Sequence, residues 1–450
     1  NSTDVWIIII FNLADTSFYL LKAKKKGRKM ETLQIGGVSC RKLADEFGTP
    51  LYIYDENKII SQAKDALEGF SSDKFDTEVV YASKAFSSLT LFRLLSSLGT
   101  GFDVVSGGEL YGVKKSGADM RKVYFHGNNK SDEEIDMAMD AGIGYFVIDN
   151  VPECARIAEA AKRKKTKVNA IIRINPGISA HTHEYIMTSA PDSKFGVHIE
   201  DKESISKMIQ ILSESPYVSH RGFHNHIGSQ IVDVSSFEKA IDTMTDFLLR
   251  MKNEYGIENS ELSIGGGFGI KYTDEDNPVL LGQMCRDMIK CTEKCLEEKN
   301  ISISKLITEP GRAMVGEAGY TLYTIGDMKR SGDKEYIFVD GGMSDNIRPA
   351  LYNAEYNADL AEKLGAAPDK EYCIAGKNCE SGDVLIENIP LPKAEKGDLL
   401  VMYSTGAYGY SMASNYNRLG RPAVVFAKDG EAKLVIRRES YEDQYSLEIE

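Results

Sequence analysis

The sequence predicts a (β/α)8 TIM-like barrel plus a C-terminal antiparallel β-domain that is completed by an N-terminal strand. The first observation is a β/α alternation that repeats eight times between about residues 77 and 308. The second is a change after about residue 320 to short β-rich segments separated by Gly, Pro and Asp. The third is a strand-like run at Leu51–Tyr54, ahead of the barrel, which we expect to join the C-terminal sheet. A doubly wound open sheet would share the local alternation, but the count of eight favours a barrel.

The barrel strands are predicted from short runs of β-branched and aromatic residues, each followed by a longer run with helical apolar spacing. The predicted strands are Glu78–Ser83, Phe102–Val105, Val123–Phe125, Tyr145–Ile148, Val168–Ile174, Val218–His224, Leu262–Ile264 and Leu306–Thr308. The predicted helices are Leu89–Leu98, Glu109–Lys115, Asp132–Asp140, Pro152–Arg163, Glu203–Leu212, Ser236–Tyr255 and Val279–Lys299. Ser131 is placed to cap one helix, and Pro152 suits the first turn of another.

The C-terminal domain is predicted from β-rich runs at Tyr336–Val339, Asp398–Val401, Ala423–Phe426 and Lys433–Ile436. We expect the barrel to occupy residues 55–315. Residues 30–54 together with 316–450 are expected to form a β-sandwich or barrel-like domain. No long Ser/Gly/Pro linker separates these parts, so we expect a tight interface between them.

The first 29 residues differ from the rest. Val5–Leu21 is mostly apolar, but Asn12 and Asp15 interrupt it, and its uninterrupted part is too short to span a bilayer. A basic run follows the apolar part, which is the reverse of a secretory signal peptide. We therefore expect residues 1–29 to be a loose extension or an expression artefact, and we expect no membrane partner. An amphipathic membrane anchor is the alternative.

The composition is that of a soluble globular protein, with 42% hydrophobic and 27% charged residues. The net charge of −13 argues against nucleic-acid binding, which needs a basic surface. The seven cysteines are scattered and include no CxxC pair, which favours reduced thiols in the cytoplasm. Cys291 and Cys295 lie four residues apart on a predicted helix, but no histidine lies nearby. We therefore expect core packing there and no metal site.

Catalytic residues of such a barrel lie where the strands end and the loops toward the helices begin. Lys84 lies at the end of the first predicted strand. Burial of an unpaired ammonium is costly, and two interpretations avoid that cost. The tip of the side chain can reach solvent, or the amine can form an imine with an aldehyde cofactor.

Two other strand ends carry groups that suit a cofactor. After the sixth strand, the flat ring of His226 can stack on an aromatic cofactor, and Ser229 can offer a hydroxyl and an amide to a phosphate. After the seventh strand, Gly265, Gly266 and Gly267 let the backbone approach a ligand closely and can form an anion cradle. The glycine run is neither a P-loop nor a GxGxxG motif.

The eighth strand end completes the set. Glu309 can face a pyridine nitrogen and hold it protonated. The amides of Gly311 and Arg312 can add to a phosphate site. With Lys84 and His226, these groups are what pyridoxal 5′-phosphate (PLP) requires, and the combination is far more specific than any one member.

These motifs resemble those of the group IV decarboxylases, within the alanine-racemase-like class of PLP enzymes. The motifs that carry the resemblance are Tyr81–Ala85, Gly101–Glu109, His226–Gln230, the run from Gly265 and Glu309–Arg312. They cover about residues 52–320. The resemblance implies a PLP enzyme with Lys84 and His226 among its catalytic residues.

Segments beyond the barrel extend the resemblance. Ser344–Tyr352 resembles the segment of the family that holds a distal carboxylate. This implies that Arg348 binds the carboxylate with its planar fork, that Tyr352 adds a hydroxyl and that Arg312 supplies a second cation. The resemblance also implies that Tyr408 touches both the cofactor and the substrate.

Asn378–Asp383 resembles a loop that family members insert from the partner subunit. This implies a homodimer with shared active sites, in which Cys379 is the proton donor and Glu380 pairs with the distal ammonium of the substrate. The reaction implied is decarboxylation of meso-2,6-diaminopimelate at its D centre to L-lysine and CO2, the last step of lysine biosynthesis.

Three alternatives stay open. An ornithine, arginine or carboxynorspermidine decarboxylase would share the chemistry, but ornithine has no distal carboxylate and does not need Arg348. An amino-acid racemase needs a base on each face of the ring, and the loop with Cys379 and Glu380 fits decarboxylation better. A non-catalytic PLP-binding carrier usually ends at the barrel, whereas this chain continues for about 130 residues.

Overall fold

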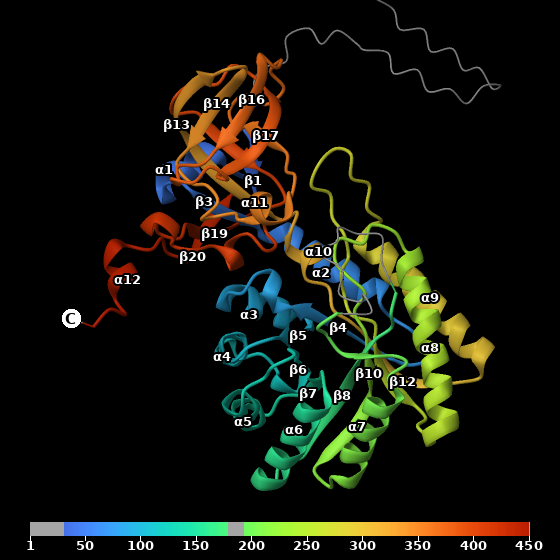
Figure 1. The fold of residues 1–450 in the computed structure, drawn as a ribbon. Helices are drawn as coiled ribbons and strands as arrows, with labels where there is room; N and C mark the ends of the chain where they lie inside the picture. The colour runs from blue at the N-terminus through green and yellow to red at the C-terminus, as the bar shows by residue number, and fades with distance from the viewer. Residues whose placement is uncertain (1–30, 179–192, 450) are drawn as a thin grey trace, which may run out of the picture.

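The computed structural model describes residues 31–178 and 193–449. Figure 1 shows a barrel surrounded by helices and a second sheet region beside it. The expectation for residues 1–29 lies outside the described residues. Across the two described ranges, no helix is both long enough and apolar enough to cross a membrane.

Eight parallel strands form the barrel in the order β4-β5-β6-β7-β8-β10-β11-β12. Their bounds are β4 (Asp76–Ala82), β5 (Gly101–Val104), β6 (Val123–Phe125), β7 (Tyr145–Ile148), β8 (Val168–Asn175), β10 (Val218–His224), β11 (Ser260–Ser263) and β12 (Ile303–Thr308). The ring is closed because β12 pairs with β4 and β10 pairs with both β8 and β11. The prediction of a barrel is confirmed, since an open sheet would have left two unpaired edges. The short strand β9 (Val197–His198) pairs with the end of β8.

Helices alternate with these strands and cover the outside of the barrel (Figure 1). Their bounds are α2 (Glu56–Gly69), α3 (Leu89–Leu98), α4 (Gly107–Ser116), α5 (Asp132–Ala141), α6 (Val151–Lys164), α7 (Lys202–Glu214), α8 (Ser235–Tyr255) and α9 (Leu281–Lys299). Ser131 caps α5 in a capping box with Glu134, and Pro152 lies in the first turn of α6. Both predicted helix starts are therefore confirmed, because these residues satisfy or remove the unpaired amides of a first turn.

The second sheet contains β3 (Leu51–Asp55), which lies between β13 and β19. The prediction that this N-terminal strand completes the C-terminal sheet is confirmed. The other strands are β13 (Gly319–Ser331), β14 (Lys334–Val339), β15 (Ala358–Leu360), β16 (Lys370–Ala375), β17 (Val384–Leu391), β18 (Leu399–Met402), β19 (Ala423–Lys428) and β20 (Glu431–Ile436). Most pairs are antiparallel, but β3–β19 and β14–β16 are parallel. The sheet is mixed because long stretches of chain, rather than hairpin turns, join the strands of these two pairs.

The remaining elements are short. They are β1 (Gln34–Ile35), β2 (Val38–Ser39), α1 (Cys40–Phe47), α10 (Arg312–Val315), α11 (Arg348–Tyr352) and α12 (Tyr441–Tyr445). The helices α10 and α11 begin with the two arginines that sequence analysis selected.

The second sheet packs directly on the end of the barrel where Lys84 lies. The ring of Tyr54 stacks on Phe86 with centroids 4.4 Å apart, and the Tyr81 hydroxyl donates to the Phe86 carbonyl at 2.9 Å. The amide of Tyr408 donates to the Ala85 carbonyl at 2.9 Å. These contacts join both parts in one apolar cluster and hold the segment around Lys84 from two sides.

Candidate active site

A cavity of about 480 Å³ lies at the carboxyl ends of the barrel strands, beneath residues of the second sheet region. Eleven of the residues selected from the sequence line it: Lys84, His226, Ser229, Gly266, Gly267, Glu309, Gly311, Arg312, Arg348, Tyr352 and Tyr408. Gly265, Cys379 and Glu380 are not among its lining residues. The cavity thus brings together side chains from the ends of several strands and from the chain beyond the barrel, as catalytic barrels require.

Lys84 lies two residues beyond the end of β4, in a short 3-10 helix formed by Ser83–Ala85. Its Nζ is 3.4 Å from Oδ2 of the buried Asp103 on β5, and 44% of the side chain stays accessible from the cavity. Burial lowers the pKa of Lys84, but the Asp103 carboxylate, with smaller contributions from Tyr408 and Glu309, raises it above its usual value overall. The free amine is therefore an ammonium that is paired and also open to the cavity.

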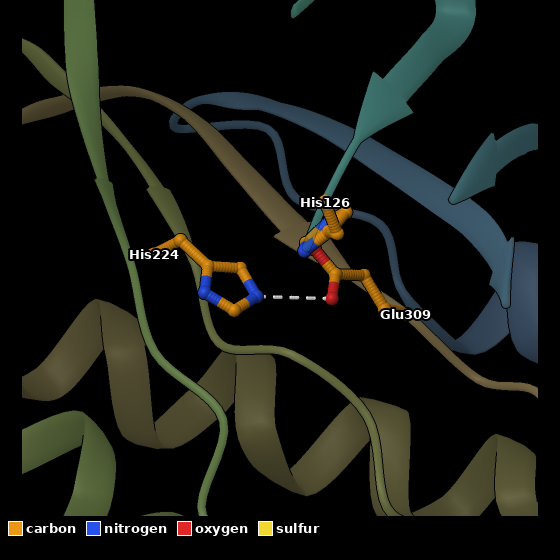
Figure 2. A group of neighbouring side chains, drawn as sticks. All are labelled: His126, His224 and Glu309. Carbon is orange, nitrogen blue, oxygen red and sulfur yellow. Dashed lines mark hydrogen bonds and ion pairs between the residues drawn. The ribbon is translucent and has the colours of Figure 1, made fainter. Parts of the chain in front are cut away.

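Glu309 follows β12 and lies beside His224 and His126 (Figure 2), with Ser263 as a third neighbour. Its Oε2 accepts a hydrogen bond from His224 Nε2 at 3.0 Å, and its Oε1 accepts one from the Ser263 hydroxyl at 2.8 Å. His126 Nε2 lies 3.4 Å from Oε1. Burial by itself would raise the pKa of Glu309, but its interactions with His224 and His126, hydrogen bonds included, hold it well below its usual range. Burial lowers the pKa of His224 to about 4, so the arrangement is a carboxylate that receives a hydrogen bond from a neutral ring.

His126, His224 and Glu309 also form a cluster that could hold a metal ion, since their ligand atoms lie within 4.8 Å of one another. A hydrogen-bonded carboxylate explains the same arrangement. Buried polar groups usually satisfy one another in this way, and the His224 ring nitrogen nearest the carboxylate already donates to it. The carboxylate that results faces the cavity and suits a protonated ring nitrogen.

His226 follows β10 and presents a neutral ring. The amide of Gly266 donates to its Nδ1 at 3.2 Å, which leaves the ring proton on Nε2. Burial lowers the pKa of His226 well below its usual value, and the nearby cations Lys84 and Arg173 lower it further. A neutral ring at the cavity wall is suited to stacking on a flat aromatic ligand.

The glycine run after β11 is required by close packing. A Cβ at Gly266 would lie 1.9 Å from the Glu309 carbonyl oxygen, so no larger residue fits there. The amides of Gly265 and Gly266 donate to the Ser263 hydroxyl and to His226, respectively. Both amides therefore have partners within the protein, and the anion cradle stays a prediction.

Arg312 and Arg348 are both buried at the cavity wall. Arg312 donates to the Ser229 hydroxyl at 2.7 Å and to the Tyr272 hydroxyl. Arg348 donates to the Tyr356 hydroxyl. Neither guanidinium forms an ion pair with a carboxylate of the described residues. Two buried cations without a carboxylate partner make this end of the cavity a site for an anion.

Cys379 and Glu380 lie on an exposed loop of the second sheet region. Asp383 anchors the loop by accepting hydrogen bonds from the amides of Asn378 and Met343 at 2.7 and 2.6 Å. The Cys379 amide donates to the Asn417 side chain at 2.6 Å. The loop therefore has a defined shape and presents its thiol and carboxylate outward.

The family described as pyridoxal-dependent decarboxylase, pyridoxal binding domain, matches residues 56–316. This stretch contains every strand of the barrel, and it includes Lys84 and Glu309. The chain belongs to this family. The resemblance found in the sequence motifs is confirmed, and so is PLP as the cofactor of this decarboxylase.

Relatives of the decarboxylase extend the match beyond the barrel. The diaminopimelate decarboxylase of Halalkalibacterium halodurans is 46% identical over 93% of this chain and 95% of its own length. That of Staphylococcus aureus is 42% identical over 91% and 95%. The solved structure of the M. jannaschii diaminopimelate decarboxylase in co-complex with L-lysine matches with a TM-score of 0.87 and 36% identity, covering 94% of this chain and 97% of that one.

The decarboxylase cavity also contains residues that sequence analysis did not select. His126 directly follows β6, Arg173 lies on β8, and both line the cavity. Asp103 on β5 and His224 at the end of β10 support Lys84 and Glu309. The rule that polar residues at strand ends carry the chemistry would have found most of them, had it been applied to every strand and not only to four.

Proposed function

We propose that this decarboxylase converts meso-2,6-diaminopimelate to L-lysine and CO2, the last step of lysine biosynthesis. The observation that carries the proposal is the presence of two buried guanidiniums, Arg312 and Arg348, which have no carboxylate partner among the described residues, in the cavity that also holds Lys84 and Glu309. A substrate with a second carboxylate would supply the anion that these cations lack. The relatives named diaminopimelate decarboxylase, 46% and 42% identical to this chain, support the same choice.

The residues that face the cavity fit PLP. Lys84 supplies the amine that attaches the aldehyde. Glu309, kept ionised by its interactions with His224 and His126, would accept a hydrogen bond from the protonated ring nitrogen, and the neutral ring of His226 would cover one face. When bound, the cofactor supplies the electron sink for the carbanion left by loss of CO2.

The phosphate of the cofactor would be held by the remaining groups at the strand ends. We assign this role to the Ser229 hydroxyl and to the amides of Gly267, Gly311 and Arg312. The contribution of Gly265 and Gly266 is the close packing of the loops, because their amides bond within the protein.

At the substrate end, Arg348 and Arg312 would bind the distal carboxylate, and Tyr352 would add its hydroxyl. Tyr408 would contact both the cofactor and the substrate. Its ring centroid lies 4.8 Å from the Arg312 guanidinium carbon, and its amide donates to the Ala85 carbonyl beside Lys84. The substrate would thus be held at a carboxylate far from the reacting carbon, which directs that carbon and its amino group toward Lys84.

The proton donor in this proposal is Cys379 of a second copy of the chain, with Glu380 of that copy binding the distal ammonium. The exposed position of both residues, outside the cavity of their own chain, supports a shared site in a homodimer. We place the enzyme in the cytoplasm, in keeping with its seven free cysteines.

A substrate panel tests the assignment. The PLP-loaded enzyme is incubated separately with meso-2,6-diaminopimelate, ornithine, arginine, carboxynorspermidine and lysine, and CO2 and amine products are measured. We expect turnover of meso-2,6-diaminopimelate to exceed that of each other compound by about 100-fold or more in kcat/KM, since a bidentate arginine contact to a carboxylate is worth several kcal/mol. Faster turnover of a compound without a distal carboxylate, racemisation without CO2 release, or no reaction at all would contradict it.

Arg348→Met provides the matched test of the substrate contact. It should raise KM for meso-2,6-diaminopimelate by roughly 100-fold, because a charge-assisted hydrogen-bonded contact is lost. Arg330→Met alters an exposed arginine on β13 and should leave KM unchanged. Equal KM values in the two variants would argue against a substrate contact at Arg348.

A further inference from the structure

Tyr272 lies between the two guanidiniums of the cavity wall. Its hydroxyl accepts a hydrogen bond from Arg312 Nη1. The Arg312 guanidinium carbon is 5.6 Å from the centroid of its ring, and the Arg348 guanidinium carbon is 4.9 Å from the same centroid. One aromatic side chain therefore contacts both cations, although Tyr272 itself does not line the cavity.

Tyr272 connects groups from different parts of the chain. It lies in the loop after β11, whereas Arg312 follows β12 and Arg348 begins α11 beyond the second sheet's first strands. The Asp276 carboxylate accepts a hydrogen bond from the Tyr272 amide at 2.9 Å, and the Tyr272 carbonyl accepts one from the Asn357 amide at 3.3 Å. Its position is therefore fixed by both the barrel and the second sheet region.

The electrostatics of the pair require such a residue. Arg312 and Arg348, which have no carboxylate partner in the part of the chain that the structure describes, repel one another, and burial strengthens the repulsion. The face of a tyrosine ring carries negative potential, and its hydroxyl oxygen accepts hydrogen bonds. Tyr272 offers both to Arg312, and it presents its ring to Arg348. It can thus keep both cations in place before an anion arrives.

Tyr356 is the natural comparison. Its hydroxyl accepts from Arg348, and its ring packs edge-on against Tyr272 with centroids 5.3 Å apart. Among the described residues it shares no hydrogen bond or cation–ring contact with Arg312. Tyr356 therefore contacts one of the two cations, Arg348, whereas the Tyr272 side chain contacts both.

We propose that Tyr272 is a positioning residue that sets the spacing of Arg312 and Arg348, so that the two guanidiniums bind one distal carboxylate and select substrates that carry it. The proposal rests on the proposed function and names a determinant of its specificity. Because Tyr272 acts through the two arginines, its loss should weaken binding of the distal carboxylate and leave the chemical step at Lys84 almost unchanged.

The test compares Tyr272→Phe with wild type and with Tyr441→Phe, an exposed tyrosine in α12. For Tyr272→Phe we expect KM for meso-2,6-diaminopimelate to rise about 10-fold, with kcat changed less than about 3-fold, as loss of one hydrogen bond to a charged group predicts. Tyr441→Phe should match wild type.

Ligand binding supplies a readout that a structural defect would not reproduce. By calorimetry on the PLP-loaded enzyme, Tyr272→Phe should bind L-lysine, which keeps the distal carboxylate, about 10-fold more weakly. Its affinity for cadaverine, which lacks any carboxylate, should equal that of wild type. Tyr272→His keeps an aromatic ring with an acceptor nitrogen and should recover part of the lysine affinity; it also serves as the test if Tyr272→Phe does not fold.

The outcomes separate the two proposals. If wild type does not decarboxylate meso-2,6-diaminopimelate, the proposed function fails. If wild type is active and Tyr272→Phe has wild-type KM and lysine affinity, only the role of Tyr272 fails. An equal loss of lysine and cadaverine binding would also overturn it, because that result describes a general collapse of the cavity.

Discussion

Lys84 Nζ lies 3.4 Å from Asp103 Oδ2, so the first two strands of the barrel place an ammonium beside a carboxylate that is itself 1% exposed. The pair explains how a lysine can point into the cavity of a large barrel without an uncompensated charge. It also has a chemical consequence, because only a neutral amine attacks an aldehyde, and Asp103 favours the charged form.

Replacement of Asp103 by Asn should make Lys84 a better nucleophile toward PLP. Without the carboxylate the pKa of Lys84 falls, so a larger fraction of the amine is neutral at pH 7.5. We expect the midpoint of the pH profile for PLP capture by cofactor-free enzyme to move down by about one unit, in line with a lost charge partner near the surface of a cavity. Absorbance of the lysine-bound cofactor measures the rate. Asp73→Asn, at an exposed position, is the control, and an unchanged profile in Asp103→Asn would refute the coupling.

Glu309→Gln should remove the carboxylate that is expected to hold the ring nitrogen protonated. The amide keeps the size of the side chain but cannot be an anion, so we expect kcat to fall by roughly 10²–10³-fold, the usual loss when one preorganised electrostatic contact is removed. PLP should still attach to Lys84, as its absorbance will report. Glu355→Gln changes an exposed carboxylate and should leave kcat unchanged. A kcat within 3-fold of wild type would exclude Glu309 from this role.

Hybrid dimers test whether Cys379 acts across a subunit interface. Lys84→Ala and Cys379→Ala chains should each be nearly inactive alone. After the two are mixed and allowed to exchange, each hybrid contains one site with both residues intact, so random pairing should restore about one quarter of the wild-type activity. This expectation follows from the symmetry of a two-fold dimer. Activity that stays at the sum of the two separate variants would mean that the site is contained within one chain.

The stability of the fold should fall between pH 6.5 and about 4. Burial lowers the pKa values of His220 and His224 to about 4, so in this window the unfolded chain binds protons that the folded chain does not. Their stabilising effect is complete above the unfolded pKa and is lost as the pH decreases, on the order of 3 kcal/mol for each histidine.

His220→Gln isolates one of these contributions, because His220 lies outside the cavity and bonds to the Gly222 carbonyl. Denaturant unfolding at pH 7, 5.5 and 4.5 should show that the free energy of unfolding decreases less with falling pH in the variant than in wild type. Parallel curves for the two proteins would contradict the prediction, because they would show that the pKa of His220 is the same in the folded and unfolded chains.

Local sequence rules predicted the strands and helices of the barrel and several of its catalytic candidates. Strand period, helical spacing and cap residues depend on neighbours in the chain, so Ser131 and Pro152 marked helix starts correctly. Lys84 and Glu309 could be selected because a barrel places strand ends on one face, whatever its exact dimensions. The parallel pairing of β3 with β19 was not predictable in the same way, because it joins segments separated by the whole barrel.

The order of elements and the kinds of chemical group at the strand ends follow from the amino-acid sequence alone. The contacts between these groups are known only from the folded structure. They are His224 with Glu309, Asp103 with Lys84, and Tyr272 with two arginines. The physical reason is the range of the interactions. Backbone periodicity is set within a few residues, whereas these contacts depend on barrel stagger and on how the second sheet packs over the cavity, which are set by apolar burial across the whole chain.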